Sequence, residues 1–138
     1  MIVNVYAAKL QKNHRLILGC LDEIYQSMRS YNQIKPVLRT FQNILLSHFG
    51  EQNKDFFDRI RPTLDGDREK MKILEFLIYN LDDIKIKTLA FLDEYPADIS
   101  DTHPHNFPQN FMEYSEEVRV RLKLEEDYLF GFLSELLN

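Results

Sequence analysis

Apolar residues that recur every three or four positions are the feature that most limits how this chain can fold. This spacing matches the α-helix, in which such residues share one face, and no useful length of chain alternates with the period of two expected for a half-buried strand. The pattern occupies four segments, near residues 10–28, 37–60, 71–91 and 111–136. It therefore predicts an all-α protein.

The four segments are separated by residues that begin or end helices. SYNQIKP lies between the first two segments, and RPTLDGD lies between the second and third, where Asp67 is a suitable N-cap for a helix beginning REKM. The prolines of YPADISDTHPHNFP end the third helix and begin the fourth, and Gly50 predicts a bend or a break in the second. Four helices of about 20–28 residues joined by short turns predict an antiparallel up-and-down four-helix bundle. We expect a single domain that spans residues 1–138.

Composition is consistent with a folded protein that lies outside membranes. The chain has 138 residues, of which 44% are hydrophobic, with ten Phe and seven Tyr, so it has enough apolar mass for a core. No apolar run approaches the roughly 20 residues that span a bilayer. The N-terminal sequence lacks the features of a signal peptide, and Cys20 lies within the apolar pattern as a small buried hydrophobe. These features predict a soluble, cytoplasmic protein.

Charge is unevenly distributed along the chain. Residues 1–64 contain nine basic and five acidic residues, whereas residues 65–138 contain eight basic and seventeen acidic residues. An acidic second half argues against direct nucleic-acid binding, which depends on neutralising phosphates. It is compatible with a basic protein partner, and equally with an ordinary solvated surface.

Five polar residues fall on the apolar faces of three predicted helices. They are His14 on the first helix, His48 and Gln52 on the second, and Arg121 and Glu125 on the fourth. Buried polar groups need partners, and a buried ion pair adds little net stability but can fix which helices face one another. We therefore predict a structural network of these five side chains. A His48–Glu125 pair could also serve as a catalytic base, but no activated nucleophile motif or glycine-rich phosphate loop accompanies it, so we expect no enzymatic activity.

A metal centre is the alternative use of such residues. LLSHFGEQ is similar to the His-Phe-x-x-Glu signature of hemerythrin-like domains, which hold di-iron centres inside helical bundles. The ligand expected four residues after His48 is Gln52 rather than Glu. Phe76 and Asn80 occupy the third-helix positions of a His-x-x-x-His pair, and Arg121 stands where the last motif begins with His. We therefore expect no metal or other cofactor, and keep a hemerythrin-like metal-binding or sensing protein, intact or degenerate, as the alternative.

Three motifs follow one another along the last three predicted helices. SHF occupies residues 47–49, NLDDIKIKTLAFLDE residues 80–94, and RLKLEED residues 121–127. Together they resemble the Rsd/AlgQ family of bacterial anti-sigma factors, whose corresponding motifs are Gly-His-Phe, Leu-Glu…Ala-Phe-x-Asp and Arg-Phe-x-Leu-Glu-Asp. Arg121 favours this family over the hemerythrin-like domains, which require histidine at that position.

The resemblance implies a transcription regulator. Family members bind the C-terminal region (region four) of the primary sigma factor and keep it from core RNA polymerase and the −35 promoter element. That surface of sigma is basic because it meets DNA phosphates, so an acidic partner suits it. We expect partner contacts at Gln42, Phe49, Glu126 and Asp127. Gln42 stands where the family has an acidic residue and Glu126 where it has aspartate, and the chain lacks the family's tryptophan in the first helix.

Overall fold

The structure of the chain is all-α. The computed structural model describes residues 2–95, 106–129, 131 and 132, and their side chains except those of residues 2–7, 31 and 51–53. Within these residues there is no β-strand, so the all-α part of the predicted fold is confirmed. Two of the elements, η1 and η3, are π-helical, and η2 is a 3₁₀ turn. The elements in chain order are α1 (Ile2–Gln26), α2 (Tyr31–Leu46), η1 (Ser47–Gln52), α3 (Asn53–Ile60), η2 (Arg61–Leu64), α4 (Arg68–Glu94), α5 (Phe107–Leu124) and η3 (Glu125–Leu129).

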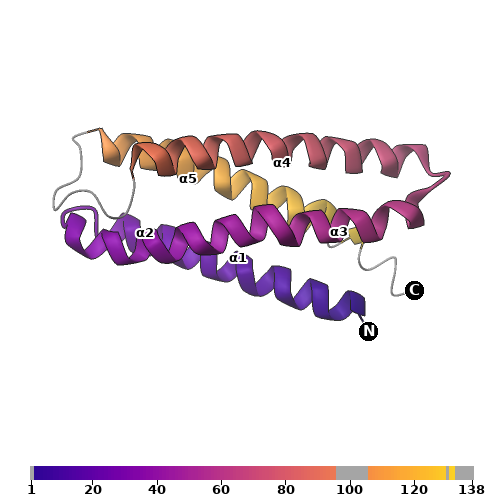
Figure 1. Cartoon of the computed structure of the whole chain (residues 1–138), viewed down its shortest axis with the longest axis horizontal. Helices are drawn as coiled ribbons and strands as arrows, with labels where there is room; N and C mark the ends of the chain where they lie inside the picture. The colour runs from indigo at the N-terminus through magenta and orange to yellow at the C-terminus, as the bar shows by residue number, and fades with distance from the viewer. Residues whose placement is uncertain (1, 96–105, 130, 133–138) are drawn as a thin grey trace.

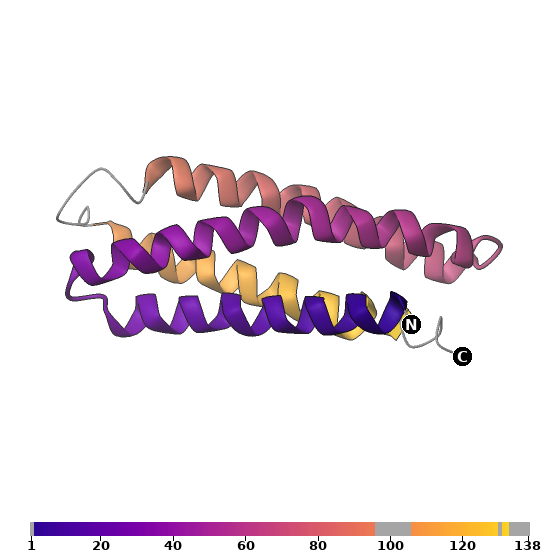
Figure 2. The same ribbon diagram turned by 60° about the horizontal axis from the view of Figure 1, so that its bottom comes forward.

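These elements form four long rods that lie lengthwise beside one another, as Figure 1 and Figure 2 show from two sides. The second rod is built from α2, η1 and α3 in succession, and the fourth from α5 and η3. α1 packs on α2 and α4 packs on α5, while contacts between α1 and α5 and between α4 and η1 join the two pairs. The fold is therefore bundle-like, with an α1–α2 layer against an α4–α5 layer.

The second rod differs from the prediction at its start and agrees with it in its middle. α2 begins at Tyr31, so the prediction that SYNQIKP separates two helices is wrong for most of that stretch, and Pro36 lies inside the helix. Proline in a helix interior costs about 3 kcal/mol because it lacks an N–H. Ile34 and Leu38, on either side of it, are completely buried, and burying each contributes about 1.5–3 kcal/mol, which offsets that cost. The break predicted at Gly50 is present as the π-helical turn η1, which separates α2 from α3.

The connection into α4 follows the predicted capping pattern. The Asp67 side chain accepts a hydrogen bond from the Lys70 backbone N–H at 3.2 Å, so its assignment as N-cap is confirmed. Gly66 precedes it with a φ of 89°, a left-handed conformation that only glycine adopts without steric cost. Pro108 lies in the first turn of α5, where its missing N–H would be unpaired in any case. The prolines at 96 and 104 lie outside the described residues.

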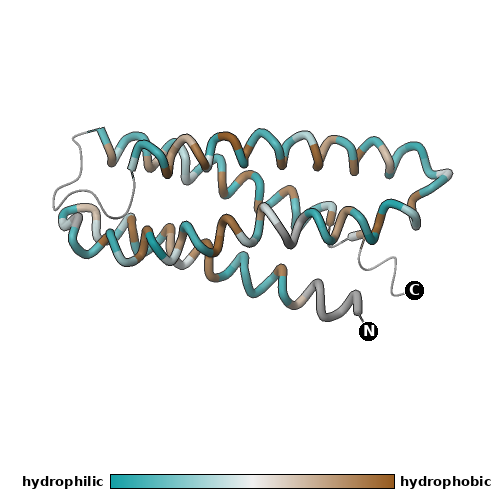
Figure 3. The backbone as a smooth tube through the Cα atoms, in the orientation of Figure 1, coloured by the Kyte–Doolittle hydropathy of each residue, from teal (hydrophilic) through white to brown (hydrophobic). Residues whose placement is uncertain are grey.

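The core consists of the predicted apolar stripes. Figure 3 shows apolar positions recurring along each rod between polar ones. Ile17, Phe41, Leu77 and Val118, one from each rod, are all completely buried. Leu136, the last residue of the predicted fourth stripe, lies outside the described residues.

A cluster of aromatic rings holds the first half of α5 against α4. Phe91 stacks on Tyr114 with ring centroids 4.5 Å apart and planes 11° apart, and Phe107 stacks on Phe111 at 5.8 Å. Tyr95 contacts both Phe91 and Phe107, each at 5.1 Å. Such pairs contribute roughly 0.5–1.5 kcal/mol beyond the burial of their area. Apolar packing thus fixes one half of α5, and the other half ends among polar groups.

Candidate functional site

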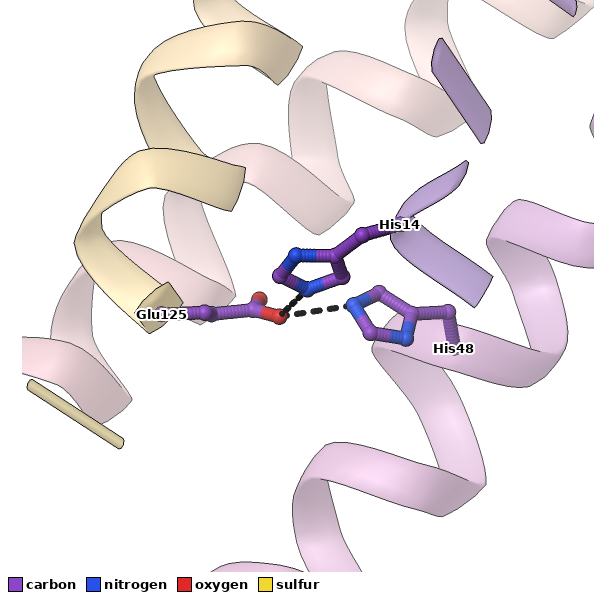
Figure 4. Close-up of side chains that lie close together, drawn as sticks. All are labelled: His14, His48 and Glu125. Carbon is purple, nitrogen blue, oxygen red and sulfur yellow. Dashed lines mark hydrogen bonds and ion pairs between the residues drawn. The ribbon is translucent and has the colours of Figure 1, made fainter. Parts of the chain in front are cut away.

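The core becomes polar where the two π-helical elements meet α1 (Figure 4). His14 projects from α1, His48 is the second residue of η1, and Glu125 is the first residue of η3. A π-helical turn closes its hydrogen bonds over five residues instead of four, so it re-orients its side chains relative to those of a continuous α-helix. Each π-helical element therefore contributes one side chain to this cluster, and such turns occur frequently at functional sites.

One carboxylate oxygen joins the two histidines. Glu125 Oε1 accepts hydrogen bonds from His14 Nε2 at 2.8 Å and from His48 Nε2 at 2.7 Å. The two imidazole rings meet edge to face, with centroids 5.1 Å apart and an angle of 79° between their planes. All three side chains are buried, with at most 2% of each residue exposed. Because both histidines donate through Nε2, each of them carries a proton on that nitrogen.

Arg121 occupies the other side of the same carboxylate. Its Nε donates to Glu125 Oε2 at 2.8 Å, and its NH1 donates to the Leu77 carbonyl at 2.8 Å and to Asn80 Oδ1 at 3.1 Å. Leu77 and Asn80 belong to α4, so the guanidinium ties the end of α5 to the middle of α4. The cluster thereby connects all four rods, through α1, η1, α4 and α5 with η3.

The surroundings of His14 favour its positively charged form. Its Nδ1 lies 3.2 Å from Glu126 Oε1, so its two ring nitrogens both face carboxylate oxygens. Burial by itself lowers the pKa of His14, but the hydrogen bonds and charges of Glu125 and Glu126 outweigh burial and raise the pKa above its usual 6.5. A doubly protonated His14 is the form that can donate to both carboxylates.

Glu125 remains ionised despite its complete burial. Desolvation would raise the pKa of its carboxyl group, but interaction with His48, hydrogen bonds from both histidines and the Arg121 charge together hold the pKa well below its usual 4.5. When His14 is protonated, it and Arg121 therefore balance the negative charges of Glu125 and Glu126. Among the described side chains, every buried nitrogen or oxygen has a hydrogen-bond partner. The polar network is satisfied from within the chain.

Three of these groups also form a set of possible metal ligands. The nearest ligand atoms of His14, His48 and Glu125 lie within 4.8 Å of one another, and two histidines with one carboxylate are donors that suit Zn²⁺ or Fe²⁺. The second oxygen of Glu125 is already paired with the permanently charged guanidinium of Arg121. A di-iron centre also needs histidines and carboxylates from all four rods, whereas α4 contributes a carbonyl and the amide of Asn80 to this cluster. These residues do not fit a di-iron centre.

The structure brings together four of the five residues expected in the polar network: His14, His48, Arg121 and Glu125. The fifth, Gln52, ends η1, but its side chain lies outside the described residues.

The four residues expected to contact a partner occupy different environments. Gln42 is half-buried on α2, and Phe49 is 2% exposed, with its ring 5.2 Å from that of His48. Glu126 and Asp127 are both exposed, and Glu126 also reaches His14. Phe49 therefore offers a partner almost no surface.

Two features of α4 differ from the sequence analysis. Phe76, expected at an inward position, is 51% exposed because it lies one residue, about 100° of helix, before the completely buried Leu77. Asn80 is an additional member of the network, which the sequence analysis considered only as a replaced metal ligand. Its position between Leu77 and Leu81, both buried, is the signal that could have identified it.

Comparisons of the chain with protein-family models, with curated proteins and with solved structures found no match. In the part of the chain that the structure describes, no helix has both the length and the apolar character needed to cross a membrane.

Proposed function

We propose that this protein is a non-enzymatic transcription regulator of the Rsd/AlgQ kind, with the antiparallel up-and-down four-helix arrangement. In this proposal it binds region four of the primary sigma factor and keeps it from core RNA polymerase and the −35 promoter element. The motifs at residues 47–49, 80–94 and 121–127 support the proposal. The side chain of Arg121, which distinguishes this family from hemerythrin-like domains, closes the polar network instead of leaving a ligand position open.

The observation that carries the proposal is that the four buried polar residues His14, His48, Arg121 and Glu125 bind one another, so that the surface is what this protein offers a second molecule. The exposed charges are distributed unevenly over that surface. On α4, α5 and η3, eleven exposed side chains are acidic and four are basic. On α1 and α2, two of the exposed side chains described are acidic and four are basic. A cationic protein surface, such as one that contacts DNA phosphates, is complementary to the α4–α5 side.

The direct test is calorimetric titration of the full chain with a purified region-four fragment of the primary sigma factor. We expect a one-to-one complex whose affinity falls as salt concentration rises, because exposed charges are screened beyond a Debye length of about 10 Å at 0.1 M salt. Neutralising Glu113 and Glu116 of α5 together, as Glu→Gln changes, should slow association. Glu23→Gln on α1 is the matched control and should leave the association rate unchanged. No association at low salt would exclude this function.

The convergence of His14, His48 and Glu125, which are donors for a single metal ion and too few for two, favours a second candidate function, a metal-binding protein of the hemerythrin-like kind. Elemental analysis of the purified full chain tests it, and two iron atoms per chain would overturn the anti-sigma proposal. Cobalt(II) titration monitored by visible absorption gives an independent measurement. His48→Gln is the control variant, because it removes one ligand atom and should abolish a spectrum that arises from this cluster.

A further inference from the structure

The outer face of α4 carries more apolar surface than a solvated helix needs. Phe76, Tyr79, Ile86 and Leu89 are 51%, 77%, 68% and 60% exposed, respectively. At 3.6 residues per turn, these four positions fall within an arc of about 140° around the helix. Single exposed apolar residues are normal, whereas several gathered on one face indicate an interaction site.

The apolar face continues into a recess between α4 and the second rod. The recess has a volume of about 120 Å³, and its walls include Leu89 from α4, Leu45 and Leu46 from α2, and Phe49 from η1, with Lys85 beside them. Leu46 is 44% exposed, so the recess opens onto the same surface as Leu89. Water in an apolar recess has few partners, and an apolar side chain that replaces it gains affinity.

An acidic groove borders the apolar face of α4 on the side away from the recess. This groove, of about 160 Å³, lies between α4 and α5, and Asp83, Glu116 and Glu117 line it together with Lys87. The Lys87 ammonium lies 3.0 Å from both Asp83 and Glu117, so one cation is shared between two carboxylates while Glu116 adds a further negative charge. Arg121 also lines the groove, but its charge is paired with the buried Glu125, so the groove retains net negative charge beside the apolar face.

We propose that α4 is the docking surface for an amphipathic, basic helix of the partner protein. The aliphatic side chains of the partner helix cover Ile86 and Leu89 and enter the recess beside Phe49. The Lys and Arg side chains of the partner helix reach the carboxylates of the α4–α5 groove. An apolar stripe flanked by acidic groups is complementary to the two faces of such a helix. A second copy of this chain is a poorer occupant, because two such surfaces would bring acidic groups together. The inference rests on the proposed function only for the identity of the partner.

Mapping of amide chemical shifts on the isotopically labelled full chain tests this surface. One titration uses the sigma region-four fragment, and a second uses a designed helix of about 18 residues with leucine and lysine at helical spacing. A peptide with serine in place of leucine and the same charge is the control ligand. The variants are Leu89→Ser and Ile86→Ser, and the matched control is Leu16→Ser, because Leu16 is an exposed leucine on α1. All three positions are exposed, so circular dichroism should show unchanged folding.

We expect both leucine-containing ligands to shift resonances of α4 and of the recess. Leu89→Ser and Ile86→Ser should each weaken binding about tenfold, and Leu16→Ser should change it less than twofold. If the fragment binds but the shifts lie on α1, away from α4 and the recess, the docking surface is wrong while the proposed function stands. If the designed helix binds through α4 but the fragment does not bind at all, the surface stands and the proposed function fails. Binding of neither ligand, equal binding of the serine peptide, or a dimer that Leu89→Ser dissociates would overturn the inference.

Discussion

Replacing Glu125 by glutamine tests whether the negative charge at the centre of the polar network holds the rods together. The carboxylate accepts three hydrogen bonds, from His14 at 2.8 Å, His48 at 2.7 Å and Arg121 at 2.8 Å. Glutamine has the same shape but offers one acceptor oxygen and one NH₂ donor. In either orientation, the NH₂ group faces an N–H donor, and the buried guanidinium of Arg121 loses its counter-charge.

The expected loss of stability follows from leaving that cation unpaired. Removing one partner of a buried ion pair costs about 3–5 kcal/mol, which is a large part of the roughly 5–15 kcal/mol that stabilises a domain. At about 4 °C per kcal/mol for a chain of this size, the melting temperature should fall by about 12–20 °C. Denaturant titration at pH 6, monitored by far-ultraviolet circular dichroism, measures the free energy of unfolding. Glu116→Gln, an exposed change on α5 in the same rod, is the control and should stay within about 0.5 kcal/mol of the parent.

A double-mutant cycle with Arg121→Met separates the ion pair from other effects. In the double variant, the glutamine NH₂ no longer meets the guanidinium, and its oxygen can still accept from the histidines. The loss should therefore be smaller than the sum of the two single losses, by about 0.5–3 kcal/mol. A loss below about 1 kcal/mol for Glu125→Gln, or strict additivity in the cycle, would refute the reasoning.

The same structure makes three further predictions. The free energy of unfolding should be greatest between pH 4.5 and 6.5. The pKa of His14 is higher in the folded than in the unfolded chain, so protonated His14 stabilises the fold fully below pH 6.5, and this stabilisation is lost as pH rises. The pKa of Glu125 is lower in the folded chain, so ionised Glu125 stabilises the fold fully above pH 4.5, and this stabilisation is lost as pH falls. His14→Gln should flatten the alkaline decline, as unfolding measured across pH will show. Lys87→Ala should cost less than about 1 kcal/mol in a denaturant titration, because its bridges to Asp83 and Glu117 are exposed. Cys20 should react with a thiol reagent much more slowly in the folded than in the unfolded protein, because burial raises its pKa and shields it.

Helical periodicity predicted which residues of each helix point into the core. His14, His48, Arg121 and Glu125 lie on apolar stripes at helical spacing, and a residue on such a stripe points inward whatever its own polarity. Their mutual contacts required the rods to be placed side by side at a matching height, which no single helix pattern specifies. The contact between His14 and Glu126 was not predicted, because Glu126 lies beside the stripe and reaches inward only through its long side chain.

Local backbone features escaped prediction for a different reason. Pro36 usually marks a helix boundary, but the burial of Ile34 and Leu38 outweighs its cost, and local propensity carries no information about such tertiary compensation. The π-helical turns at 47–52 and 125–129 likewise have no strong sequence signature. Each one contains a residue of the polar network, so contacts between rods account for them better than local sequence does.

The polar network also explains why the surface dominates how this protein can meet other molecules. When His14 is protonated, Arg121 and His14 balance Glu125 and Glu126, so the four groups together contribute little net charge to the long-range field. Most of the net charge of the chain, which is −5 with neutral histidines, therefore arises from other residues, and the acidic excess lies on the α4–α5 side. A core built only from apolar residues could be as stable as this one. The hydrogen bonds of Arg121 to Leu77 and Asn80 fix the rotation of α4 about its own axis, because they hold the face that carries these two residues toward the core. That same rotation keeps Tyr79 and Ile86 on the outer face, where a partner can reach them.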